Sequence, residues 1–390
     1  MPLRAMQQCQ GSRVNQQAAP RQHLRPFTPH SGHLGTHRAS CGFSSSSSVS
    51  AARCPASTST PRNTRRTPPA RAMCVPMAAA PNSEADRKMI VSITGATGLV
   101  GSRLVSKLAS QGHQVRVLTR DVQAAKGKLP FPGLRFFSQA QWAAAIAGST
   151  GVVNLAGEPI ATRWTPDHKA AIKASRVKAT QAVVAGIEAA PLEQRPRVLV
   201  SASAVGFYGN SQSSSFVEES GSGADYLAEI CKEWEAAAMM ASSQAGVRTV
   251  VLRIGIVLAP DGGALAKMMP VFQIFAGGPL GSGRQWMSWI HRDDLVDLII
   301  TALSNQAYSG VYNATAPKPV MMSELCSQLG GIMGRPSWLP VPDFALQTLL
   351  GEGATVVLEG QKVLPARTQA QGFNFKYNDV GAALKNILRR

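Results

Sequence analysis

The chain has 390 residues and a formal net charge of +18, but this charge is distributed unevenly along the sequence. Residues 1–83 contain ten arginines and no lysine, aspartate or glutamate. The remaining 307 residues carry 30 basic and 22 acidic side chains, so the body of the protein is only mildly basic and its charge does not indicate nucleic-acid binding.

Residues 1–83 have the composition of a leader. They are rich in arginine and serine, include the run Ser44–Ser48, and show no apolar periodicity. Such a segment cannot bury enough apolar surface to offset its chain entropy, so we expect it to be disordered. The composition is typical of an organelle transit peptide, cleaved near Arg71–Ala80. Its length and serine content favour the chloroplast, with the mitochondrion as the alternative; the other interpretation is a nonspecific basic tail.

The cysteines and the hydropathy pattern limit the compartment further. Four of the six cysteines lie in residues 1–83, and the remaining Cys231 and Cys326 show no metal-ligand spacing. We therefore expect a reducing compartment and neither a disulfide nor a metal site. No apolar stretch is long enough for a secretory signal or a membrane span, whereas peripheral association with a plastid membrane stays open.

After the leader, β-rich apolar runs alternate with helical patterns. The expected strands are Gln114–Leu118, Leu134–Phe137, Gly151–Leu155, Arg197–Ser201 and Thr249–Ile254. The expected helices lie near Pro166–Glu188, Asp225–Ser243, Phe344–Leu350 and Asp379–Leu388. This alternation predicts an α/β fold with a doubly wound, Rossmann-type parallel sheet and a smaller C-terminal lobe.

The same pattern suggests how the chain is divided. We expect a nucleotide-binding domain over residues 84–255 and a mixed substrate lobe with some return to the sheet over residues 256–340. Residues 341–390 form a C-terminal segment. Ligands of such sheets bind at the carboxyl ends of the strands, and the motifs described next fall there.

The first strand ends in a glycine-rich turn. Glycine follows the run Val91–Thr94 at Gly95 and recurs at Gly98 and Gly101, before an amphipathic helix. Glycines between a strand and a helix allow a tight turn and a close approach of the backbone to a pyrophosphate, although they also serve ordinary turns. The helix N-terminus offers N–H donors to the anion. The predicted cofactor-binding residues here are Thr94, Gly95, Thr97, Gly98, Leu99, Val100 and Gly101.

Arg120 marks the end of the second strand. An acidic residue at this point binds the ribose 2′-hydroxyl of NAD, whereas an arginine accommodates the 2′-phosphate of NADP. Arg120 favours NADP, although Asp121 follows directly and Arg120 could be only a solvated loop charge.

Two further strand ends carry small or polar residues. The segment Asn154, Leu155, Ala156 and Gly157 follows the fourth strand. Small residues there let the backbone pass the nicotinamide ribose, so we assign the segment to cofactor binding, although taken alone it could equally form a simple turn. Ser203 ends the fifth strand, where its hydroxyl either polarises a substrate oxygen or caps the next turn.

Together these segments resemble the extended short-chain dehydrogenase/reductase superfamily. The segments 154–160, 288–294, 351–352 and 356–365 are similar to an atypical epimerase-like subgroup with a characteristic C-terminal domain. The resemblance covers residues 89–388. It implies a Rossmann-type fold, a bound NADP and an unknown small-molecule substrate such as a nucleotide sugar. The plant form of this subgroup is plastid-located and linked to control of chloroplast division.

The superfamily uses a tyrosine with a lysine four residues later, whose charge lowers the pKa of the phenol. The matching tyrosine is Tyr226, but Ile230 stands at the lysine position, and Lys232 faces away on a helix. We expect Tyr226 to keep a pKa near its ordinary value unless another cation replaces the lysine. Either the chemistry uses another acid or base, or there is little chemistry.

Other side chains receive structural interpretations. Trp234 should pack on the sheet, with Glu233 and Glu235 facing solvent, and Asp294 should cap a helix. Arg176 or Lys178 could approach a substrate from an otherwise solvated helix face.

Two functions follow. The leading hypothesis is an NADP-binding oxidoreductase or nucleotide-sugar epimerase-like protein of the chloroplast, with Tyr226 and Ser203 as catalytic residues. The alternative is an NADP-binding regulatory or scaffold protein in which catalysis is weak or absent, and Ile230 supports it.

Overall fold

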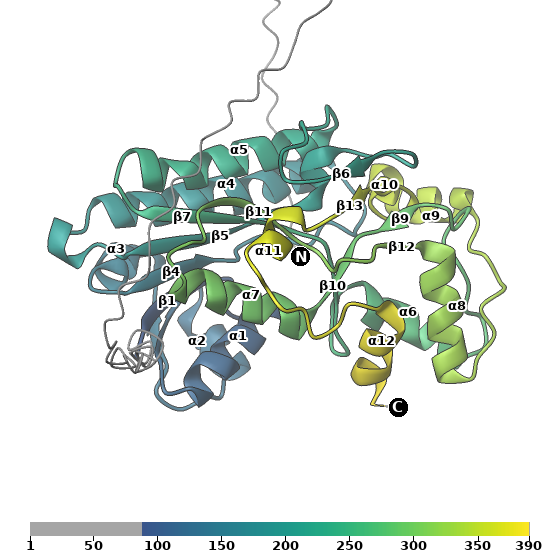
Figure 1. Cartoon of the computed structure of the whole chain (residues 1–390), viewed down its shortest axis with the longest axis horizontal. Helices are drawn as coiled ribbons and strands as arrows, with labels where there is room; N and C mark the ends of the chain where they lie inside the picture. Colours follow the sequence, from purple (N-terminus) through teal and green to yellow (C-terminus); the bar gives the residue numbers. More distant parts are fainter. Residues whose placement is uncertain (1–87, 390) are drawn as a thin grey trace, which may run out of the picture. The chain divides into compact units, whose positions relative to one another are not determined.

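A computed structural model describes residues 88–389 of the chain. The leader predicted for residues 1–83 lies outside the described residues. The central sheet has seven parallel strands in the order β11-β7-β5-β4-β1-β2-β3. Figure 1 shows this sheet with helices packed around it. In chain order its strands are β1 (Ile90–Thr94), β2 (Gln114–Leu118), β3 (Arg135–Phe137), β4 (Gly151–Asn154), β5 (Val198–Ala204), β7 (Arg248–Ile254) and β11 (Gly310–Ala314). The predicted doubly wound α/β fold is confirmed.

Helices cover both faces of the sheet. One face carries α3 (Trp142–Ile146), α4 (Pro166–Glu188) and α5 (Tyr226–Ser243); the other carries α1 (Leu99–Ser110) and α7 (Arg292–Ser304), and α2 (Val122–Lys128) follows β2. On the first face, Val183 and Ala241 of the helices pack in one core with Leu199 of β5. On the second face, Leu104 of α1 and Ile299 of α7 belong to a separate core. Burial on both faces explains why the strands read as continuous apolar runs.

The chain order of the strands reverses between β1 and β4, which are neighbours in the sheet. Their register pairs Thr94 with Asn154, so both strands end at the same edge. Such a switch point opens a crevice in which ligands of open α/β sheets bind.

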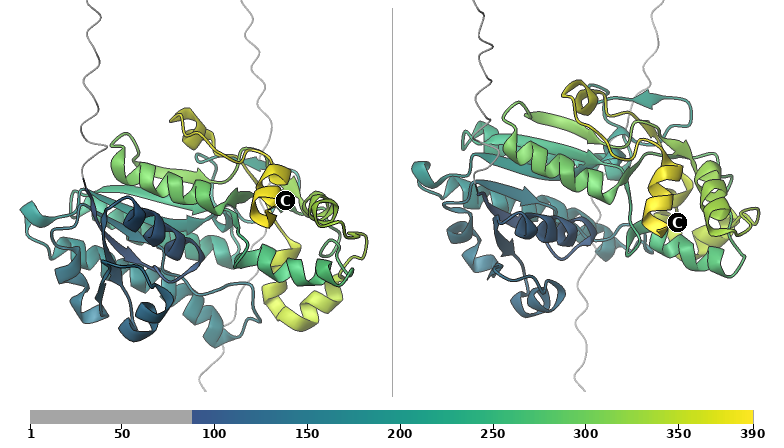
Figure 2. Two further views of the ribbon diagram at one scale, coloured as in Figure 1. Left: turned by 90° about the horizontal axis from the view of Figure 1, so that it is seen from below. Right: turned by 60° about the horizontal axis from the view of Figure 1, so that its bottom comes forward.

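A smaller lobe adjoins this edge. It contains α6 (Gly263–Gln273), α8 (Met322–Met333) and α12 (Val380–Leu388), which share a core that includes Leu265, Leu329 and Leu384. Short strands connect the lobe to the rest, namely β8 (Ile256–Leu258) with β10 (Trp289–His291) and β9 (Trp286–Met287) with β12 (Val320–Met321). Figure 2 shows α8 and α12 side by side at this end of the protein.

The C-terminal segment crosses back to the main body. It contains α9 (Asp343–Leu350), α10 (Thr355–Leu358), β13 (Lys362–Val363) and α11 (Ala366–Ala370). β13 pairs with β6 (Ser215–Phe216), which precedes α5. The segment therefore reaches the carboxyl edge of the sheet. Within residues 88–389, no helix is long and apolar enough to span a membrane.

The start of α7 differs from the expectation. His291, not Asp294, caps the helix, because its Nδ1 accepts the backbone N–H of Asp293 at 3.1 Å. Asp294 is buried and accepts the backbone N–H groups of Lys376 and Tyr377 instead, at 2.9 and 3.0 Å. The carboxylate thus anchors the C-terminal segment to α7.

Candidate functional site

The turn between β1 and α1 needs glycine at two positions. Gly95 has a φ of +65°, and a Cβ on it would lie 2.4 Å from the carbonyl oxygen of Leu155. A Cβ on Gly101 would lie 2.2 Å from the oxygen of Gly95. Only glycine therefore permits this close packing of turn, helix and β4 loop.

Gly98 begins α1 without a side-chain cap, and the first turn of the helix has no acidic residue. By contrast, Asp121, Thr165 and Asp225 cap α2, α4 and α5. The N–H groups at the start of α1 therefore carry the positive end of the helix dipole with no side-chain acceptor, which suits an anion.

Asn154 lies beneath the turn and is fully buried. Its Oδ1 accepts the hydroxyl of Thr94 at 2.7 Å, and its Nδ2 donates to Thr180 at 2.7 Å and to Ser201 at 3.2 Å. These bonds tie β1, β4, β5 and α4 together at the carboxyl edge. Asn154 and Thr94 position the turn, and neither lines the pocket described next.

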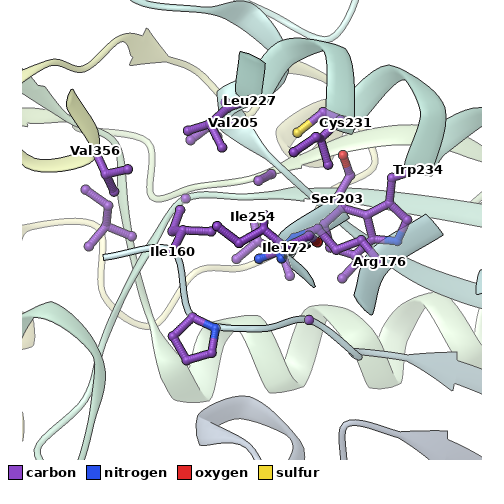
Figure 3. Close-up of a pocket in the computed structure, with 18 of the residues that line it drawn as sticks. Ile160, Ile172, Arg176, Ser203, Val205, Leu227, Cys231, Trp234, Ile254 and Val356 are labelled. Atoms are coloured by element: carbon purple, nitrogen blue, oxygen red, sulfur yellow. Dashed lines mark hydrogen bonds between the residues drawn. The ribbon is translucent and has the colours of Figure 1, made fainter. Parts of the chain in front are cut away.

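A cavity of about 790 Å³ extends from the glycine turn along the carboxyl edge of the sheet. Figure 3 shows Ser203, Arg176 and Trp234 toward one end and Ile160 and Val356 toward the other. The residues predicted from the sequence that line it are Gly95, Gly98, Leu99, Val100, Gly101, Leu155, Gly157, Ser203 and Tyr226. Those that do not are Thr94, Thr97, Arg120, Asn154 and Ala156.

Arg120 lies at the end of β2 with its side chain 79% exposed, and it contacts Glu158 at 3.2 Å. An exposed ion pair of this kind contributes little to stability, so a stronger anion can displace Glu158 from Arg120. Asp121, which left the cofactor preference ambiguous, is engaged elsewhere because its carboxylate caps α2 through the N–H of Ala124.

Ser203 takes part in a buried network. Its hydroxyl donates to Oε1 of Glu235 at 2.7 Å, and Arg253 donates to both oxygens of this carboxylate, at 2.8 and 2.9 Å. Arg253 also donates to Tyr208, which donates to Asn313. The expectation that Glu235 faces solvent is wrong. Its carboxylate is buried because the ion pair with Arg253 compensates the cost of burial. Of the two glutamates, only Glu233 faces outward, where it contacts Lys173 at 2.6 Å.

Tyr226 begins α5 at the pocket wall. Its hydroxyl donates to the carbonyl oxygen of Lys169 at 2.7 Å, and the Lys169 ammonium lies 4.5 Å from the centroid of its ring. Burial raises the pKa of Tyr226 above its ordinary value, and the charges of Lys169, Lys173 and Arg176 offset this only partly. Ile230 is buried in the same wall and Lys232 is exposed, as expected.

Several pocket residues were not predicted. Trp234 was expected only to pack on the sheet. In the structure it also lines the pocket, where Arg176 lies above its ring. Cys231 also lines it, where burial raises the thiol pKa to about 12. The C-terminal segment contributes Glu352, Val356 and Glu359. Only their long-range packing places these residues here, so local sequence patterns give no signal for them.

Fold and site together define a Rossmann-type α/β protein with a glycine turn at the switch point of its sheet and a second lobe over the pocket. Residues 91–314 match the model of the NAD dependent epimerase/dehydratase family, and residues 341–387 match a domain of unknown function, DUF1731. The chain belongs to the NAD dependent epimerase/dehydratase family.

Its relatives include plant, bacterial and human proteins. The chain is 56% identical to the chloroplastic SDR39U1 homolog of Arabidopsis thaliana over 311 residues, 79% of this chain and 89% of the relative. It is 36% identical to the epimerase family protein YfhF of Bacillus subtilis, over 77% and 98% of the two chains. The crystal structure of human SDR39U1 isoform 2 with NADPH is 34% identical, covers 77% of this chain and 100% of its own, and superposes with a TM-score of 0.71.

The buried network yields a stability prediction. Glu235→Ala leaves the Arg253 guanidinium buried without its carboxylate, so the free energy of unfolding should fall by about 3–5 kcal/mol. Glu233→Ala, two residues earlier on the same helix, removes only an exposed pair and should cost about 1 kcal/mol or less. Urea unfolding of the two variants makes the comparison; equal losses would show that the Glu235 pair is not buried as described.

Proposed function

We propose that the protein binds NADP(H) at the glycine turn and works in the chloroplast as an epimerase-family protein whose tyrosine-centred proton transfer is weak. The observation that carries the cofactor proposal is the turn itself. Gly95 and Gly101 lie where a Cβ would collide with backbone, and Gly98 leaves the start of α1 without a side-chain cap. The NADPH bound to the human relative supports this assignment.

The residues present fit such a cofactor. Gly98, Leu99 and Val100 would face the pyrophosphate, and Leu155 and Gly157 would border the nicotinamide ribose. When bound, NADP(H) supplies hydride transfer. Thr94 and Asn154 would act from beneath, by holding the turn and the β4 loop in register.

Arg120 supports NADP over NAD. It stands at the end of β2 with only an exposed contact to Glu158, whereas the neighbouring carboxylate of Asp121 caps α2. A 2′-phosphate would therefore meet an exposed guanidinium, and it would compete for it only with the exposed contact to Glu158.

The surroundings of Tyr226 support weak catalysis. A phenol that donates to the carbonyl of Lys169, with a raised pKa and isoleucine in place of lysine, holds its proton at neutral pH. Cofactor occupancy would then serve to stabilise one conformation, in a regulatory or scaffold role. Control of plastid division, which the resemblance to the plant form implies, is the process we assign to it.

A second candidate is a working oxidoreductase or nucleotide-sugar epimerase. The large pocket and the presence of Ser203 in its wall favour it. Because Ser203 already donates to Glu235, it could only accept a hydrogen bond from a substrate without breaking that contact.

Cofactor binding tests the first proposal. Wild-type protein should bind NADPH more tightly than NADH, and Arg120→Ala should remove most of the difference, about ten- to hundredfold. Gly98→Asp should abolish binding of both nucleotides by charge repulsion. Because Gly98 has a φ of −81° and an acidic cap favours a helix, this variant should remain folded. Equal titration curves for NADPH and NADH in the wild type would contradict the NADP assignment.

Paired substitutions on α5 separate the two candidates. If Tyr226 is a working proton donor, Tyr226→Phe should lower the rate of NADPH oxidation about 10²–10⁴-fold. Our proposal instead predicts little turnover in the wild type and unchanged NADPH affinity in Tyr226→Phe. Ile230→Lys should then increase turnover and move its pH optimum toward neutrality, because the cation favours phenolate. A panel of aldehydes and nucleotide sugars provides the assay, and rapid wild-type turnover lost in Tyr226→Phe would overturn the proposal.

The chloroplast assignment rests on the composition of residues 1–83 and on the chloroplastic relative. Residues 1–83 fused to a fluorescent protein should enter the chloroplast, and the mature chain should begin between Ala72 and Ala85. A cytosolic or mitochondrial fusion would contradict the assignment.

A further inference from the structure

One cation in the pocket has no acidic partner. Two basic residues line the cavity, and Lys169 forms an ion pair with Glu352 at 2.8 Å. Within the described part of the chain, Arg176 forms no salt bridge. Its guanidinium donates only to the carbonyl oxygens of Ile172, at 3.1 Å, and Glu158, at 3.0 Å. Of its five N–H donors, these contacts leave others available to a ligand.

The guanidinium is held in place. Its Cζ lies 5.4 Å from the centroid of the Trp234 ring. On another side, a Cβ on Gly157 would lie 3.3 Å from Cζ, so the absence of a side chain there makes room for it. Burial lowers the pKa of Arg176. The protein therefore maintains a partly desolvated, oriented cation, an arrangement that a bound anion would stabilise.

The acids around the cavity are already engaged. Glu158 contacts Arg120, Glu352 contacts Lys169, and Asp225 caps α5 through the N–H of Ala228. Glu359 accepts a hydrogen bond from Asn210. None of these four carboxylates forms an ion pair with Arg176, and among them only Glu158 acts on its charge, from beyond salt-bridge distance.

We infer that Arg176 binds the carboxylate of a small organic ligand with an apolar body, an inference that rests on the proposed cofactor site beside it. Much of the remaining wall is apolar and includes Ile160, Val205 and Val356. In Figure 3, Arg176 extends from α4 toward Ile172 and Ile254. A planar carboxylate matches the fork of a guanidinium, and the pyrophosphate of the cofactor has its own place at the start of α1. The superfamily has a lysine on α5 at the position of Ile230. In this protein Arg176 instead brings a positive charge to the pocket from α4.

Calorimetric titration with benzoate and its neutral isostere benzamide tests this inference on protein saturated with NADP⁺. Wild type should bind benzoate more tightly than benzamide. Arg176→Met should weaken benzoate binding about ten- to hundredfold and leave benzamide unchanged. Arg176→Lys should retain part of the preference. The matched control is Lys178→Met, an exposed cation on the same helix outside the cavity wall, which should behave as wild type.

The NADP⁺ affinity and the unfolding curve of each variant are also measured. They distinguish a loss of carboxylate binding from a loss of the cofactor site or of the fold. No binding of benzoate to the wild type, equal binding of benzoate and benzamide, or an unchanged Arg176→Met would overturn the inference. A tenfold loss of NADP⁺ affinity in a folded Arg176→Met would assign Arg176 to the cofactor instead and would also overturn it. If the wild type binds no NADP⁺, the proposed function fails, and the same benzoate titration on the free protein decides the role of Arg176 alone.

Discussion

The ion pair between Glu235 and Arg253 is the interaction on which the geometry of the site depends. Both side chains are buried, and two hydrogen bonds join them at 2.8 and 2.9 Å. Although burial alone lowers the pKa of Arg253, the hydrogen bonds and charge of Glu235 raise it above its ordinary value. The pair joins α5 to β7, and Ser203 extends the contact to β5. Neither charge can be removed alone without leaving the other unpaired in a low-dielectric interior.

This pairing determines which side of α5 faces the pocket. With Glu235 turned toward the sheet, the residues spaced by four, Tyr226, Ile230 and Trp234, form the pocket wall. Ile230 leaves this wall without a charge, and Arg176 enters from α4 to lie over Trp234. Our proposal therefore separates cofactor binding from proton transfer. The glycine turn is complete, whereas the phenol of Tyr226 is occupied by a backbone carbonyl.

Sequence patterns predicted the parts of the fold that depend on local chemistry. The bounds of β2 and α4 agree with the predicted ones, and the glycine turn lies between β1 and α1 as expected. The helix α8 was not predicted, since it lies in a stretch that read as irregular. Glu235 was misjudged because its partner Arg253 lies on a separate strand. The C-terminal contribution to the pocket likewise depends on the pairing of β13 with β6, which no local pattern indicates.

The state of the Tyr226 phenol tests the central claim most directly. The chain has five tyrosines, so ¹³C labelling of tyrosine rings gives a small set of resonances, and the Tyr226→Phe variant assigns the one of interest. A pH titration of the NADP⁺-loaded protein should show this phenol ionising above its ordinary pKa of about 10. A Tyr226 resonance that titrates near neutrality would show an activated proton donor and would contradict the account.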